Sequence, residues 1–301
     1  MRNARLLAIG DDVCDKYLSR GKMYPGGQAV NTCAYAVMNG VEAAFLGKFG
    51  SDEVAQCLQD TLDALGIDRS RCRSFEGENG FACVTLAGSD RVFIGSNKGG
   101  VTAVNPYCFT AEDLDYIKGF DLVYSDLNAY VEEDLPFIAS AGVPIAYDFS
   151  LRWTDAYLAR ICPYIKVALL SCAHLDQEAR EREMKKAASY GVPLVLGTIG
   201  EDGSWLLYRD RFYYAPAVFS DDVFDTMGAG DSYFATFLST LLKKQAAGEI
   251  RLDGSEDLSL ALVEAMNAGA AFAAGVCGME GAFGYGVPIA GRIIDNRSQS
   301  V

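Results

Sequence analysis

The most informative stretch of the chain is DTMGAGDS, residues 225–232, which stands directly before a run of helical period over 233–242. Its small residues Gly228, Ala229 and Gly230 leave the backbone N–H groups at the helix start unblocked by side chains. With the positive end of the helix dipole, these N–H groups form an anion site. Asp231 lies inside that site, where a carboxylate would repel a bound phosphate. Its presence is explained if it accepts the proton of a hydroxyl group that attacks a phosphoryl group, so Asp231 is the candidate catalytic base. The alternative is a glycine-rich helix start in which Asp231 is an ordinary first-turn carboxylate.

Outward from this stretch, short apolar runs of strand length alternate with longer stretches of helical period, which predicts βαβ units on a mostly parallel sheet and an α/β fold class. The small, apolar residues 261–278 predict a buried helix packed closely on that sheet. The expected strands cover 6–9, 43–46, 122–124, 145–147, 167–170 and 194–198, and the expected helices cover 29–39, 52–65, 177–190 and 230–242.

Two segments interrupt this alternation, because they have the pattern of short strands with no helix between them. They predict a small β lid built from about 16–24 and 81–97, placed to cover a ligand. No low-complexity tract or Pro/Ser-rich linker divides the chain, so we expect a single domain over residues 1–301 that carries this lid.

Composition and charge exclude several classes of protein. Half of the 301 residues are hydrophobic, which predicts a sizeable core. The 40 Asp and Glu residues exceed the 26 Lys and Arg residues, and the net charge of -14 disfavours binding to nucleic acid or to anionic membranes. We find no apolar run of transmembrane length and no signal peptide pattern, so a soluble, cytoplasmic protein is expected.

Cysteine and histidine content restricts the chemistry further. The nine cysteines are scattered and form no C-x-x-C pair, which disfavours a disulfide framework or a structural zinc site. His174 is the one histidine in the sequence, and we expect it at a helix start or on the surface.

The DTMGAGDS stretch resembles the C-terminal signature D-T-x-G-A-G-D of the ribokinase-like carbohydrate kinases of the phosphofructokinase B type, and it matches every fixed position. The N-terminal signature of that family is similar to GGQAVN at residues 26–31. The resemblance covers nearly the whole chain and implies a three-layer α/β/α fold, with Mg-ATP as phosphoryl donor and a sugar as acceptor. It also implies that Gly27 and Asn31 bind the sugar, since paired glycines allow close approach and an amide both donates to and accepts from hydroxyls.

Further positions follow from the same resemblance. Asp15 resembles the sugar-binding aspartate of the family, and Asp11 and Asp12 are close rivals for that role. A monovalent cation, K⁺, is expected in some members near the residue that corresponds to Asp225. Residues of the nucleotide site are implied to be Thr198, Gly200 and Gly203 in a T-x-G-x-x-G turn, and Asn267 in the small-residue helix.

One element departs from the family pattern. Many members carry N-x-x-E after the strand expected at 167–170, where it organises magnesium through water, but this chain has SCAH at 171–174. Asp176 or Glu178 could substitute, and the sequence leaves the metal ligands open. We therefore expect Mg²⁺ to be held mainly by the phosphates of ATP.

Several segments resemble the members of the family that phosphorylate fructoselysine, which implies transfer of the γ-phosphoryl group of ATP to its 6-hydroxyl. In that case Arg91, in the expected lid, would meet the substrate carboxylate or a sugar hydroxyl, although a solvated turn residue explains Arg91 equally well. These segments are 9–11 with Asp15 and Tyr17, 90–93, 147–150 with Trp153, 225–232 and 281–286.

Four alternatives stay open at this point. The chain could be a fructokinase, another ketose kinase or a nucleoside kinase of the same family. It could also be a non-catalytic regulatory protein that binds a sugar or a nucleotide, although the unbroken run 228–231 with Asp231 favours an enzyme. The expected partners are a small-molecule sugar and ATP, and a homodimer could form through the apolar lid residues Val92, Phe93 and Ile94, which could instead cover the sugar.

Overall fold

The computed structural model describes residues 2–87, 90–220 and 222–294. Its largest sheet has the strand order β14-β13-β12-β11-β10-β9-β1-β4. Strands β4 to β12 in this order are parallel, and β13 and β14 are antiparallel at one edge, so the predicted mostly parallel sheet is confirmed. The strands are β1 (Arg5–Ile9), β4 (Glu42–Leu46), β9 (Leu122–Asp126), β10 (Ile145–Asp148), β11 (Val167–Ser171), β12 (Leu194–Thr198), β13 (Ser204–Tyr208) and β14 (Arg211–Ala215).

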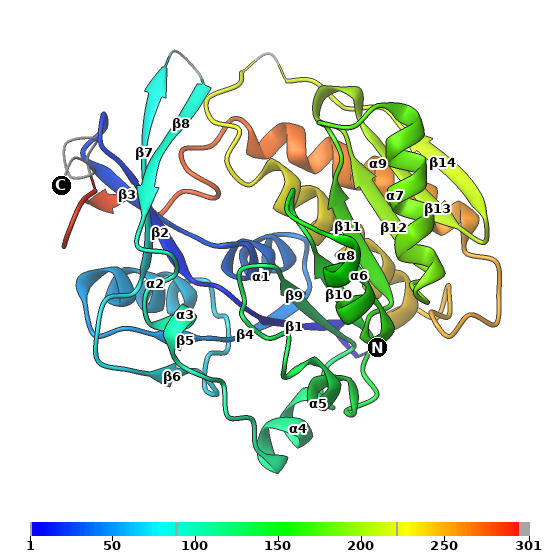
Figure 1. Ribbon diagram of the computed structural model, residues 1–301, viewed down its shortest axis with the longest axis horizontal. Helices are drawn as coiled ribbons and strands as arrows, with labels where there is room; N and C mark the ends of the chain where they lie inside the picture. Colours follow the sequence, from blue (N-terminus) through cyan, green and yellow to red (C-terminus); the bar gives the residue numbers. More distant parts are fainter. Residues whose placement is uncertain (1, 88–89, 221, 295–301) are drawn as a thin grey trace.

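Helices cover both faces of this sheet, because its central strands bury side chains on alternate sides. In β1, Leu6 and Ala8 join one core cluster and Leu7 and Ile9 join the other. The result is the expected three-layer α/β/α arrangement (Figure 1). One face carries α1 (Gln28–Met38), α8 (Ala229–Ala246) and α9 (Ser259–Val276), and the other carries α4 (Ala111–Ile117), α5 (Leu135–Ala139), α6 (Asp155–Ile161) with the short 3₁₀ turn Cys162–Tyr164, and α7 (Gln177–Ser189).

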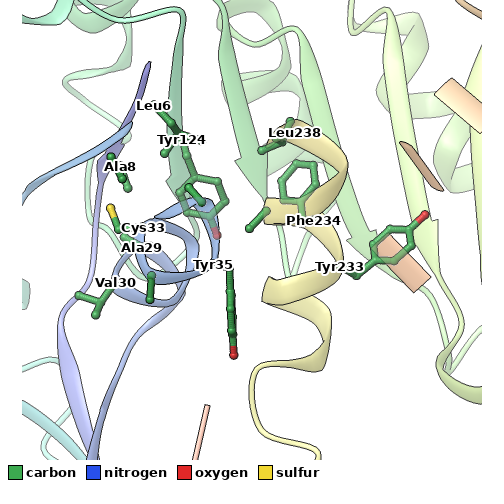
Figure 2. Close-up of a cluster of buried hydrophobic side chains, with 14 of the residues drawn as sticks. Leu6, Ala8, Ala29, Val30, Cys33, Tyr35, Tyr124, Tyr233, Phe234 and Leu238 are labelled. Atoms are coloured by element: carbon green, nitrogen blue, oxygen red, sulfur yellow. The ribbon is translucent and has the colours of Figure 1, made fainter. Parts of the chain in front are cut away.

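The core between α1 and α8 holds the two helices together over the sheet. Figure 2 shows Tyr124 of β9 and Phe234 of α8 between these helices, and their ring centroids lie 6.0 Å apart in an edge contact. Aromatic pairs of this kind add to the stabilisation from burial alone. Helices α1 and α8 also pack directly against each other.

A second sheet, with the order β15-β3-β2-β7-β8, stands beside the main body, and its β7–β8 hairpin projects outward (Figure 1). The segment 16–24, expected to contribute short strands to a lid, contains parts of two antiparallel strands joined by a turn at residues 18–21. Gly21 has a φ of 63°, which glycine adopts without strain, and it closes that turn. The strands are β2 (Val13–Tyr17), β3 (Lys22–Gly26), β7 (Gly80–Ala87), β8 (Asp90–Ser96) and β15 (Val287–Pro288).

The remaining elements lie outside the two larger sheets, and β5 (Lys48–Phe49) pairs with β6 (Arg73–Ser74) in a separate two-stranded sheet. Helix α2 (Glu53–Ala64) begins at the N-cap Asp52, whose side chain accepts a hydrogen bond from the Ala55 backbone N–H, and it packs against β2 and β3. The other elements are α3 (Val101–Val104) and the 3₁₀ turn Gly200–Asp202.

By its length and apolar composition, helix α9 could cross a membrane. The core helices of soluble proteins have the same length and composition, so this is weak evidence for a membrane span. Helix α9 packs along α8 and against β14, the edge strand of the main sheet, which agrees with the expectation of a helix packed on that sheet. A methyl group at Gly269 would lie 2.8 Å from the Tyr233 carbonyl oxygen of α8, so the absence of a side chain permits this close packing.

Candidate active site

The candidate site lies at the carboxyl ends of the parallel strands. Strand β1 sits between β4 and β9, so the order in which the chain adds strands reverses at β1. Open α/β sheets bind ligands in the crevice at such a reversal. Asp11 and Asp12 follow β1, Asp126 ends β9, and Asp148 ends β10.

Helix α8 begins at this edge with the backbone shape expected of an anion site. Gly228 caps the helix with a φ of 74°, and a methyl group there would lie 2.2 Å from the Tyr35 hydroxyl oxygen. A methyl group at Gly230 would meet no described atom within 4 Å, so the backbone of the first turn is open on that side. The start of α8 is therefore open to a ligand at Gly230, and phosphate binding by Gly228, Ala229 and Gly230 stays a prediction.

A cavity of about 360 Å³ adjoins the start of α8. This volume lies in the range of small-molecule sites, and most of the lining is apolar. The cavity brings Thr198, Gly200 and Gly203 of the β12–β13 corner together with Ala229 and Gly230. Other lining residues are Val218, Phe219 and Val223 before the loop, and Ala270, Ala273, Ala274 and Cys277 of α9.

Two of the predicted nucleotide-binding residues differ in their position relative to the cavity. Gly203 has a φ of 94°, and a methyl group there would lie 2.2 Å from the Ala215 carbonyl oxygen, so this corner requires glycine. Asn267 is exposed on α9 and is not among the residues that line the cavity. Its role in nucleotide binding stays a prediction.

The two signature segments meet through a side-chain hydrogen bond. The Asn31 amide nitrogen of α1 donates to Asp231 Oδ2 of α8 over 2.6 Å. A methyl group at Gly26 would lie 3.0 Å from Asp15 Oδ2 and 3.7 Å from Asn31 Oδ1, so both side chains face the backbone of the paired glycines. Gly27 has a φ of 100° and packs against the Asp11 backbone, where a side chain would clash. The structure thus brings Asp15, Gly27, Asn31 and Asp231 to one place.

The rivals Asp11 and Asp12 face different surroundings. Asp11 Oδ1 accepts a hydrogen bond from the Ala29 backbone N–H at the start of α1. Burial raises the pKa of Asp11 to about 7, with further contributions from the charges of Asp231 and Asp15. Asp12 is buried beside Thr102, which donates to its Oδ1 over 3.1 Å, so Asp12 lies away from this cluster.

Sequence reasoning missed two further carboxylates, Asp126 and Asp148. Both are buried, and burial raises the pKa of Asp126 well above its ordinary value and that of Asp148 to about 7. The charge of Asp231 raises both pKa values further. Each stands at the carboxyl end of an apolar strand, and this position is the signal that could have identified them.

Sequence reasoning also missed a row of hydrogen-bonded polar side chains at the same edge of the sheet. The Asn128 amide donates to Gln28 Oε1 over 2.8 Å, and Arg152 Nη2 donates to Asn128 Oδ1 over 2.6 Å. Gln28 belongs to the N-terminal signature, and a hydrogen bond from its side chain lowers the pKa of Asp148. Arg152 is exposed and therefore offers a cationic group beside the buried carboxylates.

Asp225, expected near a monovalent cation, is buried among protein groups. Its Oδ2 accepts a hydrogen bond from the Tyr17 hydroxyl over 2.6 Å, and its Oδ1 accepts one from the Met227 backbone N–H over 3.0 Å. Arg20 Nη1, in the turn between β2 and β3, lies 3.7 Å from Asp225 Oδ2.

The segment after β11 is exposed and does not gather metal ligands. Asp176 is the N-cap of α7, where its side chain accepts from the Ala179 backbone N–H, and Glu178 is exposed in the first turn. His174 is exposed just before α7 and contacts the Trp153 ring, so the expected surface position is confirmed. Within residues 2–87, 90–220 and 222–294, no three His, Cys, Asp or Glu side chains form a group that could hold a metal ion.

The expected lid residues lie on β8. Arg91 is paired with Leu86 across the β7–β8 hairpin, and its side chain lies outside the described part of the structure. Val92 and Phe93 are exposed, with 43% and 63% of their surface accessible. The substrate role of Arg91 therefore stays a prediction.

Comparison with known proteins agrees with this geometry. The family model described as pfkB family carbohydrate kinase matches residues 5–288. The chain is 38% identical over 285 residues to the fructosamine kinase FrlD of Bacillus subtilis, covering 94% of each chain. It is 31% identical over 233 residues to the fructoselysine 6-kinase of Shigella flexneri, covering 77% of this chain and 87% of that protein.

A solved structure shows the same fold. The crystal structure of a fructokinase from Xylella fastidiosa with bound ATP superimposes with a TM-score of 0.75 at 20% identity, over 93% of this chain and 94% of that one. The family match, the two relatives and the meeting of the two signatures at Asn31 and Asp231 lead to one assignment: the chain belongs to the PfkB family of carbohydrate kinases and is a phosphotransferase.

Proposed function

We propose that the protein transfers the γ-phosphoryl group of ATP to the 6-hydroxyl of fructoselysine and yields fructoselysine 6-phosphate and ADP. The observation that carries the kinase chemistry is the hydrogen bond between Asn31 and Asp231 at the start of α8, beside the cavity. This hydrogen bond joins the side chains that we propose as the sugar-binding amide and the catalytic base, on the two helices α1 and α8.

In the proposed mechanism, Asp15, Gly27 and Asn31 hold the sugar, and the cavity holds the nucleotide with its phosphates at the first turn of α8. A new bond forms between the 6-oxygen and the γ-phosphorus, the hydroxyl proton passes to the Asp231 carboxylate, and the bond from the γ-phosphorus to ADP breaks. The backbone N–H groups of the loop stabilise charge on the transferring group, so positioning and electrostatics supply most of the rate.

We propose that Mg²⁺ reaches the site bound to the nucleotide. Asp231 stands beside the helix start, while no described side chains form a separate metal group there. Bound with the nucleotide, Mg²⁺ would neutralise part of the negative charge of the phosphates. We propose that this chain contributes the backbone N–H groups around Gly228 and leaves Mg²⁺ to the phosphates.

The charge of the site favours a fructosyl amine over a neutral sugar. Fructoselysine carries a secondary ammonium group, and a cation relieves the cost of ionising the buried carboxylates Asp11, Asp126 and Asp148. The relatives named fructosamine kinase and fructoselysine 6-kinase support the same class of substrate. Arg152 is placed to bind the carboxylate of the lysine part, and Arg91 on β8 is the other candidate.

Two coarser expectations remain proposals as well. We propose a cytoplasmic location and a homodimer that pairs the exposed Val92 and Phe93 of two lids. Light scattering on wild type and on Phe93→Ser tests the dimer, because the substitution removes a large apolar contact and is expected to give a monomer.

A coupled ADP-release assay with Mg-ATP tests the substrate. Fructoselysine, fructose, ribose, 2-keto-3-deoxygluconate and adenosine are compared side by side, with Asp231→Asn as the blank. We expect a strong preference for fructoselysine in kcat/KM. Preference for a free sugar or for adenosine would overturn the substrate and keep the kinase, whereas no ADP release with any of the five would favour a non-catalytic binding protein.

A further inference from the structure

The residues around Asp225 indicate how the loop of Gly228, Ala229 and Gly230, here called the anion loop, is kept in position. Asp225 is only 2% exposed, so its carboxylate is shielded from solvent. A buried carboxylate is stabilised by hydrogen bonds and a nearby positive charge. Here the Tyr17 hydroxyl and the Met227 backbone N–H supply hydrogen bonds, and Arg20 supplies the charge.

Arg20 is held for this task by aromatic rings. Its guanidinium lies 4.4 Å from the ring centroid of Phe224 and 5.2 Å from that of Tyr17. Phe224 is the neighbour of Asp225 in the chain, and Tyr17 is the residue that donates to its carboxylate. Arg20 Nη1 is buried and makes no hydrogen bond, so its charge acts on Asp225 through proximity, 3.7 Å away.

These residues do not fit a monovalent cation at Asp225. Both carboxylate oxygens already accept hydrogen bonds from protein donors. A cation bound to Oδ2 would also lie close to the guanidinium, and two like charges in a buried place repel strongly.

We propose that the guanidinium of Arg20 takes the place of the monovalent cation, so that this kinase needs no K⁺. The charge comes from the turn between β2 and β3 of the second sheet, which ties that sheet to the segment that leads into Gly228. Arg20 is therefore a positioning residue, because it acts through Asp225 on the anion loop and does not touch the substrate. This proposal rests on the proposed kinase function only for its activity readout.

The first test is the response of wild type to cations. Thermal unfolding and ADP release are measured in about 100 mM KCl and in tetramethylammonium chloride of equal ionic strength, so that screening is the same in both salts. We expect the same Tm and the same kcat in the two salts. A higher Tm and a large activation in KCl would overturn the proposal, and the Tm comparison decides it even if the sugar substrate is another one.

The second test removes the charge and keeps the apolar stem. Arg20→Met is expected to lower Tm and kcat in tetramethylammonium chloride and to regain part of both in KCl, because a small cation can then approach Asp225. Arg20→Lys keeps a positive charge and is expected to stay independent of K⁺, and Arg182→Met, on the exposed face of α7, is the matched control for loss of an arginine. Arg20→Met with wild-type Tm and kcat in both salts would contradict the proposal. If Arg20→Met does not fold, wild type and Arg20→Lys still decide the question.

Discussion

The two glycines of the anion loop differ in the space around them. Gly228 is left-handed and packs against Tyr35, whereas Gly230 faces open space at the cavity. The same substitution at these two positions therefore separates the demands of folding from the demands of phosphate binding. Both residues belong to one turn, so the comparison is closely matched.

We predict that Gly228→Ala lowers the free energy of unfolding by about 2 kcal/mol or more, because it adds left-handed strain to a clash with the Tyr35 hydroxyl. Gly230→Ala is expected to leave the free energy of unfolding unchanged or slightly raised, since nothing obstructs its methyl group. The same methyl group stands where a phosphate approaches the backbone, so kcat/KM for ATP is expected to fall. Chemical denaturation and ADP release measure the two effects, and a fully active Gly230→Ala variant would argue against phosphate binding at this turn.

Asp148 gives a prediction about pH. Burial raises its pKa from 3.8 to about 7, so the folded chain favours the protonated form. Its contribution to stability is present below about pH 4 and is lost as the pH rises through about 7. Asparagine does not ionise, so Asp148→Asn does not lose stability in this pH range. We therefore expect the free energy of unfolding of Asp148→Asn, minus that of wild type, to be larger at pH 8 than at pH 5. Denaturation at both pH values, with the exposed Asp202→Asn as control, measures it, and an equal difference at both would refute the assignment.

At the scale of elements, the packing of α9 on α8 sets one wall of the cavity. Gly269 lies against Tyr233 of α8, while Ala270, Ala273 and Ala274 of α9 line the cavity. The small side chains of α9 therefore serve both close packing and the space for a ligand. A substitution at Gly269 is therefore expected to weaken nucleotide binding and to leave sugar binding unchanged.

We predict that Gly269→Ala destabilises the fold by about 1–3 kcal/mol, because its methyl group would lie 2.8 Å from the Tyr233 carbonyl oxygen and force the helices apart. The KM for ATP is expected to rise, and the KM for the sugar is expected to stay the same. Gly275→Ala on the same helix meets no atom within 4 Å and is the control. If Gly269→Ala raised the KM for the sugar instead, the cavity would not be the nucleotide site.

The long elements could be predicted from the sequence, and the short ones could not. Helices α1, α2, α7 and α8 show enough turns to reveal their period, and the parallel strands are short, continuous apolar runs. Helices α3 to α6 have four to seven residues, too few for a period to appear. The edge hairpin of β13 and β14 was missed because its two strands are short runs of mostly apolar and aromatic residues without clear alternation.

The same contrast holds within the site. Asp231 and Asn31 could be predicted because each belongs to a local signature whose small neighbours explain it. Asp126 and Asp148 could not, since a single polar residue after a strand gains meaning only when the strand order is known. Arg20 was missed for a similar reason, because it approaches Asp225 from a turn about two hundred residues away in the chain.

At the scale of the whole molecule, three parts converge on one site. The main sheet supplies Asp11, Asp126 and Asp148, the second sheet supplies Asp15 and Arg20, and α8 supplies the anion loop with Asp231. The second sheet is therefore connected to the candidate site at its base, and its β7–β8 hairpin projects outward from the main body (Figure 1). Movement of this sheet would exclude water from the transferring phosphoryl group.

The most direct test of the central claim is the phosphorylation of fructoselysine by Asp231→Asn under single-turnover conditions, with ATP binding measured by calorimetry. Proton transfer by a positioned base contributes about 10²–10⁴-fold, so we expect the rate to fall by that factor while ATP still binds. Asparagine has nearly the same shape and can still accept a hydrogen bond from Asn31, which keeps the site assembled. If Asp231→Asn kept more than about a tenth of the wild-type rate, Asp231 would not be the catalytic base.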